Sequence, residues 1–206
     1  MALRALSLNK IFLFAALSFV GCANHKEEKY TVVFEKVDVS DIPDITASVK
    51  DEKPKFDNGI CYYSGFPFSG FVKESYETDT LKSIASYYKG KLHGITKTFY
   101  PNGKCRDERS YKDNLSYGSH VGFWENGNPK FDFIYYNDKL EGIQKQWYEN
   151  GKPYTMQTYA NDSENGMQKA WRRNGKLFAN YEVKNGVCYG LQKTNLCYTL
   201  RKEKIE

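Results

Sequence analysis

The sequence has few of the residues and patterns that catalysis and metal binding require. Its three histidines, His25, His93 and His120, are scattered, and its cysteines show no CxxC spacing. No grouping of Ser, His and an acidic residue has a recognisable catalytic signature. We therefore expect neither an enzyme nor a cofactor or metal site.

The chain also lacks a large excess of charge of one sign. Its 30 Lys and Arg against 25 Asp and Glu give a formal charge of +5. Removal of residues 1–21, which hold Arg4 and Lys10 and no acid, leaves +3, because 5 − 2 = 3. Proteins that bind nucleic acid normally show a clustered and much larger basic excess. No nucleic-acid partner is therefore expected.

Long amphipathic patterns typical of helices are few, whereas aromatic residues are abundant. The chain has 17 Tyr and 13 Phe but only 3 Met. Aromatic side chains pack well on the pleated surface of a sheet. The composition therefore predicts an all-β fold.

The first 21 residues are a predicted secretory signal. Its basic part is followed by an apolar run, residues 11–20, that is shorter than the roughly 20 residues of a membrane-spanning helix. The segment Phe19-Val20-Gly21-Cys22 resembles the lipobox of bacterial lipoproteins, although Phe19 replaces the usual Leu. Cys22 is then the acylated first residue of the mature chain. The alternative is an ordinary cleaved signal with a chance cysteine.

Residues 22–29 are polar and charged, which predicts a tether between a lipid and the fold. Lys26-Glu27-Glu28 resembles the short signal that carries some lipoproteins of the Bacteroidota to the outer face of the outer membrane. A solvated spacer is the alternative. We expect a bacterial cell-envelope protein, attached through its N-terminal lipid to the outer membrane, with surface exposure left open.

Four cysteines remain in the mature chain: Cys61, Cys105, Cys188 and Cys197. An even number in an oxidising compartment allows up to two disulfides, in three pairings among which the sequence does not choose. Buried thiols that act as small apolar side chains are the alternative.

A 24-residue period dominates the rest of the chain. Its glycine column is Gly70, Gly94, Gly118, Gly142, Gly166 and Gly190, and its Asn-Gly pairs begin at Asn102, Asn126, Asn150 and Asn174. Two aromatic columns are Tyr87, Tyr111, Tyr135 and Tyr159, and Phe99, Phe123, Trp147 and Trp171. The predicted organisation is an N-terminal strand and irregular cap over residues 30–57, a repeat array over 58–197 and a tail over 198–206.

Each unit of the array is predicted to be a β-hairpin. Asn-Gly favours a tight two-residue turn with positive φ at both residues, and strand-like runs flank it. A single hairpin is only marginally stable in water, so the stacked array is the folding unit. The predicted fold is an elongated, twisted antiparallel sheet of tandem hairpins.

Alternation along the first strand of each hairpin predicts the two faces of this sheet. Ile95 and Phe99 share one face, where an apolar ladder crosses the repeats. Gly94 and Tyr100 lie on the other face. Tyr111 joins them if the turn has two residues, whereas a longer loop shifts the register by one. The glycines either permit a tight bend or leave room for a neighbouring ring.

Two segments, Phe99-Tyr100-Pro101-Asn102-Gly103-Lys104 and Trp147-Tyr148-Glu149-Asn150-Gly151-Lys152, resemble the MORN repeat and more closely its bacterial variant. That variant occurs in proteins named YwqK-family antitoxins of toxin–antitoxin systems, and residues 59–70 resemble their first unit. The resemblance covers residues 58–195. It implies an elongated antiparallel sheet with roles in protein interaction and no catalytic residues.

Two columns of the repeat are candidates for an interaction surface. One holds Lys97, Lys145 and Lys169, and the other holds Tyr100, Trp124 and Tyr148. The lysines either meet phosphates and acidic headgroups or cover neighbouring rings with their stems. The aromatic side chains either form a platform for sugars or peptides or stabilise the sheet.

The leading functional hypothesis is a non-catalytic envelope lipoprotein whose repeat array binds another protein or serves as a scaffold. The alternatives are an antitoxin of the YwqK family and an envelope protein that binds a glycan.

Overall fold

The computed structural model describes residues 35–50 and 54–191, whose regular elements are all β-strands. The predicted signal, Cys22, the tether, the expected strand at residues 30–34 and Cys197 lie outside the described residues. The predicted all-β fold is confirmed for the part that is described.

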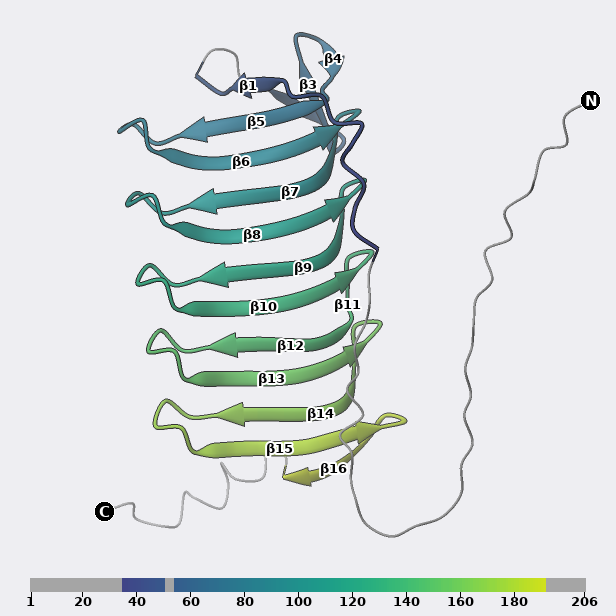
Figure 1. The fold of residues 1–206 in the computed structure, drawn as a ribbon. Coiled ribbons are helices and arrows are strands. Elements are labelled where there is room, and N and C mark those ends of the chain that lie inside the picture. Colours follow the sequence, from purple (N-terminus) through teal and green to yellow (C-terminus); the bar gives the residue numbers. More distant parts are fainter. Residues whose placement is uncertain (1–34, 51–53, 192–206) are drawn as a thin grey trace, which may run out of the picture.

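The strands form one long sheet and one small sheet (Figure 1). The long sheet has 13 strands in the spatial order β1-β5-β6-β7-β8-β9-β10-β12-β13-β14-β15-β16, with β11 paired to β10. Its strands are β1 (Thr46–Ser48), β5 (Gly70–Ser75), β6 (Leu81–Tyr88), β7 (Lys91–Phe99), β8 (Cys105–Lys112), β9 (Leu115–Phe123), β10 (Pro129–Tyr136), β11 (Lys139–Leu140), β12 (Gly142–Trp147), β13 (Pro153–Ala160), β14 (Ser163–Trp171), β15 (Leu177–Lys184) and β16 (Val187–Leu191). The small sheet consists of β2 (Lys55–Asp57), β3 (Ile60–Tyr63) and β4 (Phe66–Pro67).

The long sheet is the predicted stack of consecutive hairpins, and it is not closed into a barrel (Figure 1). One pair departs from the expected antiparallel pattern, because β1 lies parallel to β5, with Thr46 opposite Phe71 and Ser48 opposite Lys73. Parallel neighbours need a long connection. Residues 49–69, which include the small sheet, supply it. The sheet is therefore mixed.

The prediction for the Asn-Gly turns is wrong in detail. At Asn102-Gly103 only the glycine has positive φ, 80°. The N–H of Gly103 donates to the carbonyl of Tyr100, and the N–H of Tyr100 donates to the carbonyl of Lys104. The side-chain oxygen of Asn102 accepts the N–H of Lys104 at 3.0 Å. Asparagine thus closes a longer loop with its side chain instead of adopting a left-handed backbone.

Tight turns with positive φ at both central residues occur at the opposite end of the hairpins, where the sequence predicted only polar bends. They are Lys89-Gly90, Asp113-Asn114, Asn137-Asp138, Asn161-Asp162 and Asn185-Gly186. This geometry matches the twist of the two flanking strands.

A β-bulge restores the register that the longer Asn-Gly loop shifts. Phe99 lies opposite Cys105, but Thr98 lies opposite Asp107, so Arg106 is an extra residue in β8. The extra residues of the other hairpins are Lys82, Lys130, Tyr154 and Phe178. As a result Tyr111 lies opposite Gly94, so the tyrosine and glycine columns share a face although the two-residue turn on which that expectation depended is absent at Asn102-Gly103.

Backbone conformation explains the glycine column. The φ angle is 137° at Gly70, 90° at Gly94 and 83° at Gly118, in the region that other residues rarely adopt. The register shifts close to these glycines, as between Ala85 and Tyr87 of β6 where it faces β7. The structure supports the tight bend at these glycines, and at Gly70 it also supports the second explanation, because a Cβ atom there would meet the ring of Phe68.

The buried apolar core lies at the N-terminal end of the array. Cys61 and Phe68 pack there with Ala47, Val72 and Tyr87. The small sheet is also tied to the first tight turn, since the N–H of Cys61 donates to the carbonyl of Gly90 at 2.7 Å. Beyond this end the described part of the long sheet is a single layer (Figure 1).

Candidate interaction surface

The two faces of the long sheet differ in their exposure. We call them the Phe/Trp face, which carries Phe99, Phe123, Trp147 and Trp171, and the Tyr face, which carries Tyr111, Tyr135 and Tyr159. On the Tyr face Gln168 is 1% and Gln144 is 3% exposed, whereas Ile95 on the Phe/Trp face is 42% exposed. The buried side chains of the Tyr face thus include polar residues, and the exposed ones of the Phe/Trp face include apolar residues.

Buried polar side chains of the Tyr face bind the backbone where one hairpin meets the next. The side-chain oxygen of Gln144 accepts the N–H of Ile134 at 2.8 Å, and its amide nitrogen donates to the carbonyl of Ile134 at 3.1 Å. Gln168 donates to the carbonyl of Thr158 at 2.7 Å. Each partner lies ten residues earlier in the chain. These contacts satisfy backbone N–H and carbonyl groups that the strand pairing between consecutive hairpins leaves without a partner.

His120 holds the same position in the preceding repeat, with Nε2 2.7 Å from the carbonyl oxygen of Ser110. We call His120, Gln144 and Gln168 the plug residues. Their role was missed by the sequence analysis. The detectable signal was a further column of the period, Thr96, His120, Gln144 and Gln168, in which a polar residue recurs next to apolar positions of the other face.

Aromatic rings enclose the histidine plug. The centroids of the Tyr111 and Tyr135 rings lie 5.3 Å and 4.7 Å from that of His120. Burial lowers the pKa of His120 below its ordinary value, against the opposing effect of the hydrogen bond with Ser110. Burial also raises the pKa of Tyr135. Burial thus favours the neutral form of both groups in the folded sheet.

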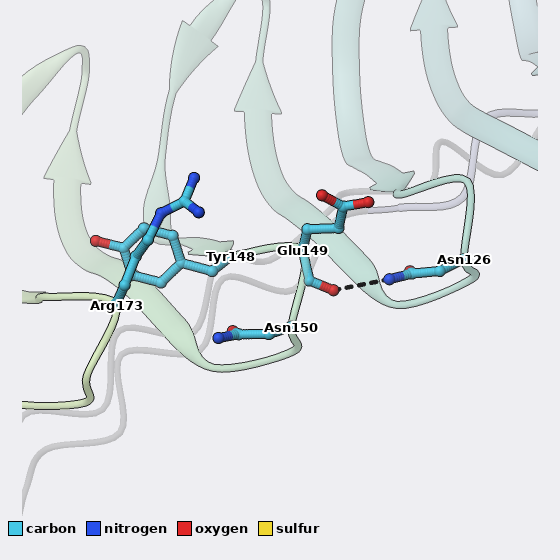
Figure 2. Close-up of a pocket in the computed structure, with 5 residues that line it drawn as sticks. All are labelled: Asn126, Tyr148, Glu149, Asn150 and Arg173. Atoms are coloured by element: carbon cyan, nitrogen blue, oxygen red, sulfur yellow. Dashed lines mark hydrogen bonds between the residues drawn. The ribbon is translucent and has the colours of Figure 1, made fainter.

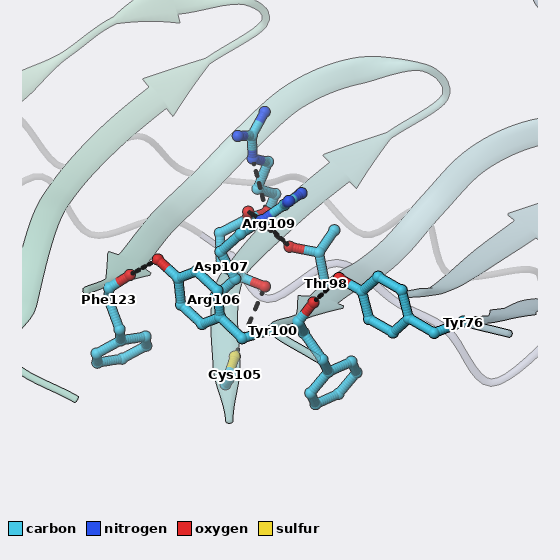
Figure 3. Close-up of polar contacts among 9 residues, drawn as sticks. Tyr76, Thr98, Tyr100, Cys105, Arg106, Asp107, Arg109 and Phe123 are labelled. Carbon is cyan, nitrogen blue, oxygen red and sulfur yellow. Dashed lines mark hydrogen bonds and ion pairs between the residues drawn. The ribbon is translucent and has the colours of Figure 1, made fainter. Parts of the chain in front are cut away.

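The predicted aromatic candidates connect each hairpin to the next (Figure 3). The hydroxyl of Tyr100 donates to the carbonyl of Phe123 at 2.9 Å, the indole N–H of Trp124 to that of Trp147 at 3.2 Å, and the hydroxyl of Tyr148 to that of Trp171 at 2.8 Å. Tyr76 makes the same bond to Phe99 at 2.8 Å. Tyr100, Trp124 and Tyr148 thus have a structural role.

In two hairpins the extra residue of the bulge forms a cation–π contact with the residue at the position of this column. Lys130 places Nζ 4.5 Å from the centre of the Trp124 ring. In the last described hairpin the cation is at the column position and the ring belongs to the extra residue. The guanidinium of Arg172 lies 5.9 Å from the ring of Phe178. A cation over a ring recurs although the two residue types have exchanged positions, which indicates that the contact stabilises the turn.

A buried carboxylate reinforces the same edge in the unit of Tyr100 (Figure 3). Asp107 is 6% exposed. It accepts a hydrogen bond from the hydroxyl of Thr98 at 2.6 Å and pairs with Arg106 at 3.3 Å and Arg109 at 3.1 Å. The two guanidinium groups and the hydroxyl offset the cost of burying its charge.

A shallow hollow lies at this edge between consecutive Asn-Gly turns, lined by Asn126, Tyr148, Glu149, Asn150 and Arg173 (Figure 2). Asn126 donates to the backbone carbonyl of Glu149 at 2.9 Å. The guanidinium of Arg173 lies 5.6 Å from the Tyr148 ring. Because its lining residues bind neighbouring turns, the hollow is best explained by the stacking of the repeats.

The lysine column lies on the Phe/Trp face, where Lys97 and Lys145 have acidic neighbours. Lys97 pairs with Glu108 at 2.8 Å, and Lys145 lies 3.9 Å from Asp132. The hydrogen bond with Glu108 raises the pKa of Lys97. Lys169 lies opposite Met156 and Asn180. The column is therefore partly neutralised and is not a uniform basic stripe.

The three described cysteines are free thiols. Cys61 is fully buried, and burial raises its pKa to about 11. Cys105 is half-buried in β8, and Cys188 is exposed in β16. No disulfide joins these three residues. A bridge to Cys197, which lies outside the described residues, stays a prediction.

The Phe/Trp face carries the predicted apolar ladder. Ile95, Ile143 and Met167 occupy equivalent positions beside the lysine column, and Phe99, Phe123, Trp147 and Trp171 are half-buried on its other side. The small sheet packs against the opposite face, through Val72 and Tyr87. A large apolar face that the small sheet leaves uncovered is typical of a site of protein interaction.

Within residues 35–50 and 54–191 no group of His, Cys, Asp and Glu side chains is placed to hold a metal ion. The same residues include no helix with the length and apolarity needed to cross a membrane.

A family model described as a MORN repeat variant matches residues 92–113 and 140–161. The two matches begin 48 residues apart, since 140 − 92 = 48, which is two periods of the array. Each spans a first strand, an Asn-Gly turn and a return strand. No curated protein matches the chain. The resemblance to MORN repeats is thus confirmed at two places, and such repeats often mediate protein or membrane interaction.

Proposed function

We propose that this chain is a non-catalytic, lipid-anchored protein of the bacterial cell envelope that binds another protein through the Phe/Trp face of its repeat array. The observation that carries the proposal is the uncovered apolar ladder on a single-layered sheet. Ile95 is 42% exposed and Leu177 is 43% exposed on this face. Burying such surface contributes about 25 cal/mol per Å² to association, before the cost of losing rotational and translational freedom.

The distribution of contacts supports the same face. On the Tyr face Gln144 and Gln168 bind backbone carbonyl groups, and the aromatic side chains at the Asn-Gly edge form hydrogen bonds between repeats. The Phe/Trp face combines apolar rows with the charged pairs Lys97–Glu108 and Lys145–Asp132. Apolar patches interrupted by paired charges are suited to a specific partner, since charges fix orientation.

Attachment through Cys22 keeps this face close to a membrane surface. The proposal rests on the lipobox-like segment and on the polar residues 22–29, which supply a tether. Metabolic labelling with a fatty-acid analogue tests it directly. The wild-type chain should be labelled and Cys22→Ser should not.

Crosslinking in intact cells tests the binding function. The lipid-labelled wild-type chain should give a discrete complex with another envelope protein. The double variant Ile143→Thr, Met167→Thr should lose that complex, because it removes apolar contact while keeping strand-forming residues. The exposed turn variant Glu77→Gln should retain it.

Equal capture by the wild-type chain and the double variant would contradict binding through the Phe/Trp face. Far-UV circular dichroism of the purified variants should show unchanged strand content, so that a lost complex is not caused by unfolding.

A further inference from the structure

The plug residues differ in one chemical property, which is the ability to take up a proton near neutral pH. Gln144 and Gln168 are neutral at every physiological pH, whereas the imidazole of His120 titrates. His120 is 5% exposed and lies in β9, in the middle of the array. The repeat thus contains one titratable group at a position that elsewhere is held by an amide.

The hydrogen bond of His120 fixes its neutral form. The carbonyl oxygen of Ser110 only accepts, so Nε2 at 2.7 Å must carry the proton, and Nδ1 is the atom that a second proton would occupy. The neighbouring rings of Tyr111 and Tyr135 lie 5.3 Å and 4.7 Å away. A second proton would therefore place a cation in a largely water-excluded site.

The charged groups around His120 compensate such a cation only in part, because Asp107 and Asp138 favour it while burial and Arg109 disfavour it. Arg109 of β8 lies directly opposite and repels it. Asp107 of β8 is already paired with Arg106 and Arg109. Asp138, in the tight turn after β10, accepts the N–H of Ser116 at 2.6 Å. From β10 the facing groups are Phe133, directly opposite, and Tyr135.

We propose that protonation of His120 at Nδ1 places a cation in this buried site and loosens the junction of β8, β9 and β10, so that acid interrupts the Phe/Trp face at the centre of the array. The effect on binding rests on the proposed function, because Val121 of β9 lies on that face between Glu108 and Asp132. The change in the sheet itself does not depend on a partner.

The pH range in which His120 destabilises the sheet follows from the direction of its pKa shift. Burial holds the pKa of folded His120 below the ordinary value of 6.5. A base with a lowered folded pKa gives its full stability above the unfolded pKa. That stability is lost as pH falls below about 6.5 toward the folded pKa, by up to tenfold in the folding equilibrium for each pH unit.

Hydrogen exchange of the purified chain at pH 7.5 and pH 5.5, corrected for intrinsic exchange rates, tests the proposal. In the wild-type chain, peptides from β8 to β10 should lose severalfold protection at pH 5.5, while peptides from β13 to β15 should not. His120→Gln should keep the protection at pH 7.5 and show no selective loss at pH 5.5, since it copies Gln144 and Gln168. His93→Gln should behave like the wild-type chain.

An equal acid-induced loss in His120→Gln, or no local loss in the wild-type chain, would overturn the proposal. His120→Thr, which copies Thr96 at the equivalent position, provides a second variant if His120→Gln does not fold. Because exchange is measured without a partner, the outcome is independent of whether the Phe/Trp face binds another protein.

Discussion

The hydroxyl of Tyr100 donates a hydrogen bond to the backbone carbonyl of Phe123 at 2.9 Å and so joins the turn of one hairpin to the strand end of the next. Tyr76, Trp124 and Tyr148 make the equivalent bond in their own repeats. A column with the appearance of a binding platform is thus used to hold the repeats together at one edge of the sheet.

Tyr100→Phe removes this bond and keeps the ring. We expect it to lower the free energy of unfolding by about 1 kcal/mol, the usual net value of a hydrogen bond in a protein. Urea denaturation followed by fluorescence measures the change. Tyr154→Phe is the matched control, because the Tyr154 ring contacts Tyr148 at 4.9 Å and its hydroxyl has no hydrogen-bond partner among the described residues. A larger loss in the control would contradict the assigned role.

Gln144→Leu tests the plug contacts. The substitution leaves the N–H of Ile134 buried without its acceptor, and an unsatisfied buried donor costs about 1–3 kcal/mol. Gln146→Leu is the control, since Gln146 is half-buried on the same strand and face. We expect a clear decrease in the urea midpoint for Gln144→Leu and little change for Gln146→Leu. Equal midpoints would show that the amide is not needed.

Gly122→Ala tests the packing of a ring against bare backbone. A Cβ atom at position 122 would overlap the ring of Phe131, whereas the backbone of Gly122 does not have the positive φ of the glycine column. We expect a loss of about 1–3 kcal/mol from overpacking. In a double-mutant cycle with Phe131→Leu the two costs should be less than additive. Strict additivity would mean that the ring and the glycine do not interact.

The lysine column is expected to be dispensable for binding to acidic lipids. Replacing Lys97, Lys145 and Lys169 by Gln should leave the affinity for anionic liposomes unaltered. Lys97 pairs with Glu108 at 2.8 Å, and Lys145 lies 3.9 Å from Asp132, so the column presents little net charge. Vesicle co-sedimentation measures the affinity, and neutral vesicles serve as the control. A marked loss would identify the column as a lipid-binding site.

The period and the faces of the sheet were predictable from the sequence because they follow from residue spacing. The 24-residue offset fixes which strands are equivalent, and alternation places Ile95 and Phe99 together. The sequence placed Gly94 and Tyr111 on one face by assuming a two-residue turn. The loop is longer and shifts the register by one residue, but the bulge at Arg106 shifts the register back, so the two residues still lie opposite each other.

The turn types were not predictable from dipeptides alone. The pair Asn102-Gly103 suits a tight turn, but the side chain of Asn102 binds the N–H of Lys104 and stabilises a longer loop. The pair Asp113-Asn114 has positive φ at both residues. The N–H of Leu92 donates to the side-chain oxygen of Asn114 at 2.7 Å, a contact between repeats that no local pattern contains.

The parallel strand and the small sheet were beyond local sequence reasoning for the same reason. The pairing of β1 with β5 and the packing of Cys61 and Phe68 on Tyr87 depend on contacts between distant parts of the chain. The sequence indicated only an N-terminal strand and an irregular cap before the array. It also could not show which face is left open, because that depends on where the small sheet packs.

Site-specific photo-crosslinking in cells tests binding through the Phe/Trp face most directly. A photoreactive residue is placed at Ile95 or Met167 on this face, and at Thr155 or Gln157 on the Tyr face. We expect a discrete crosslinked partner from positions 95 and 167 and none from positions 155 and 157. Crosslinks of equal yield from both faces, or from the Tyr face alone, would contradict this expectation.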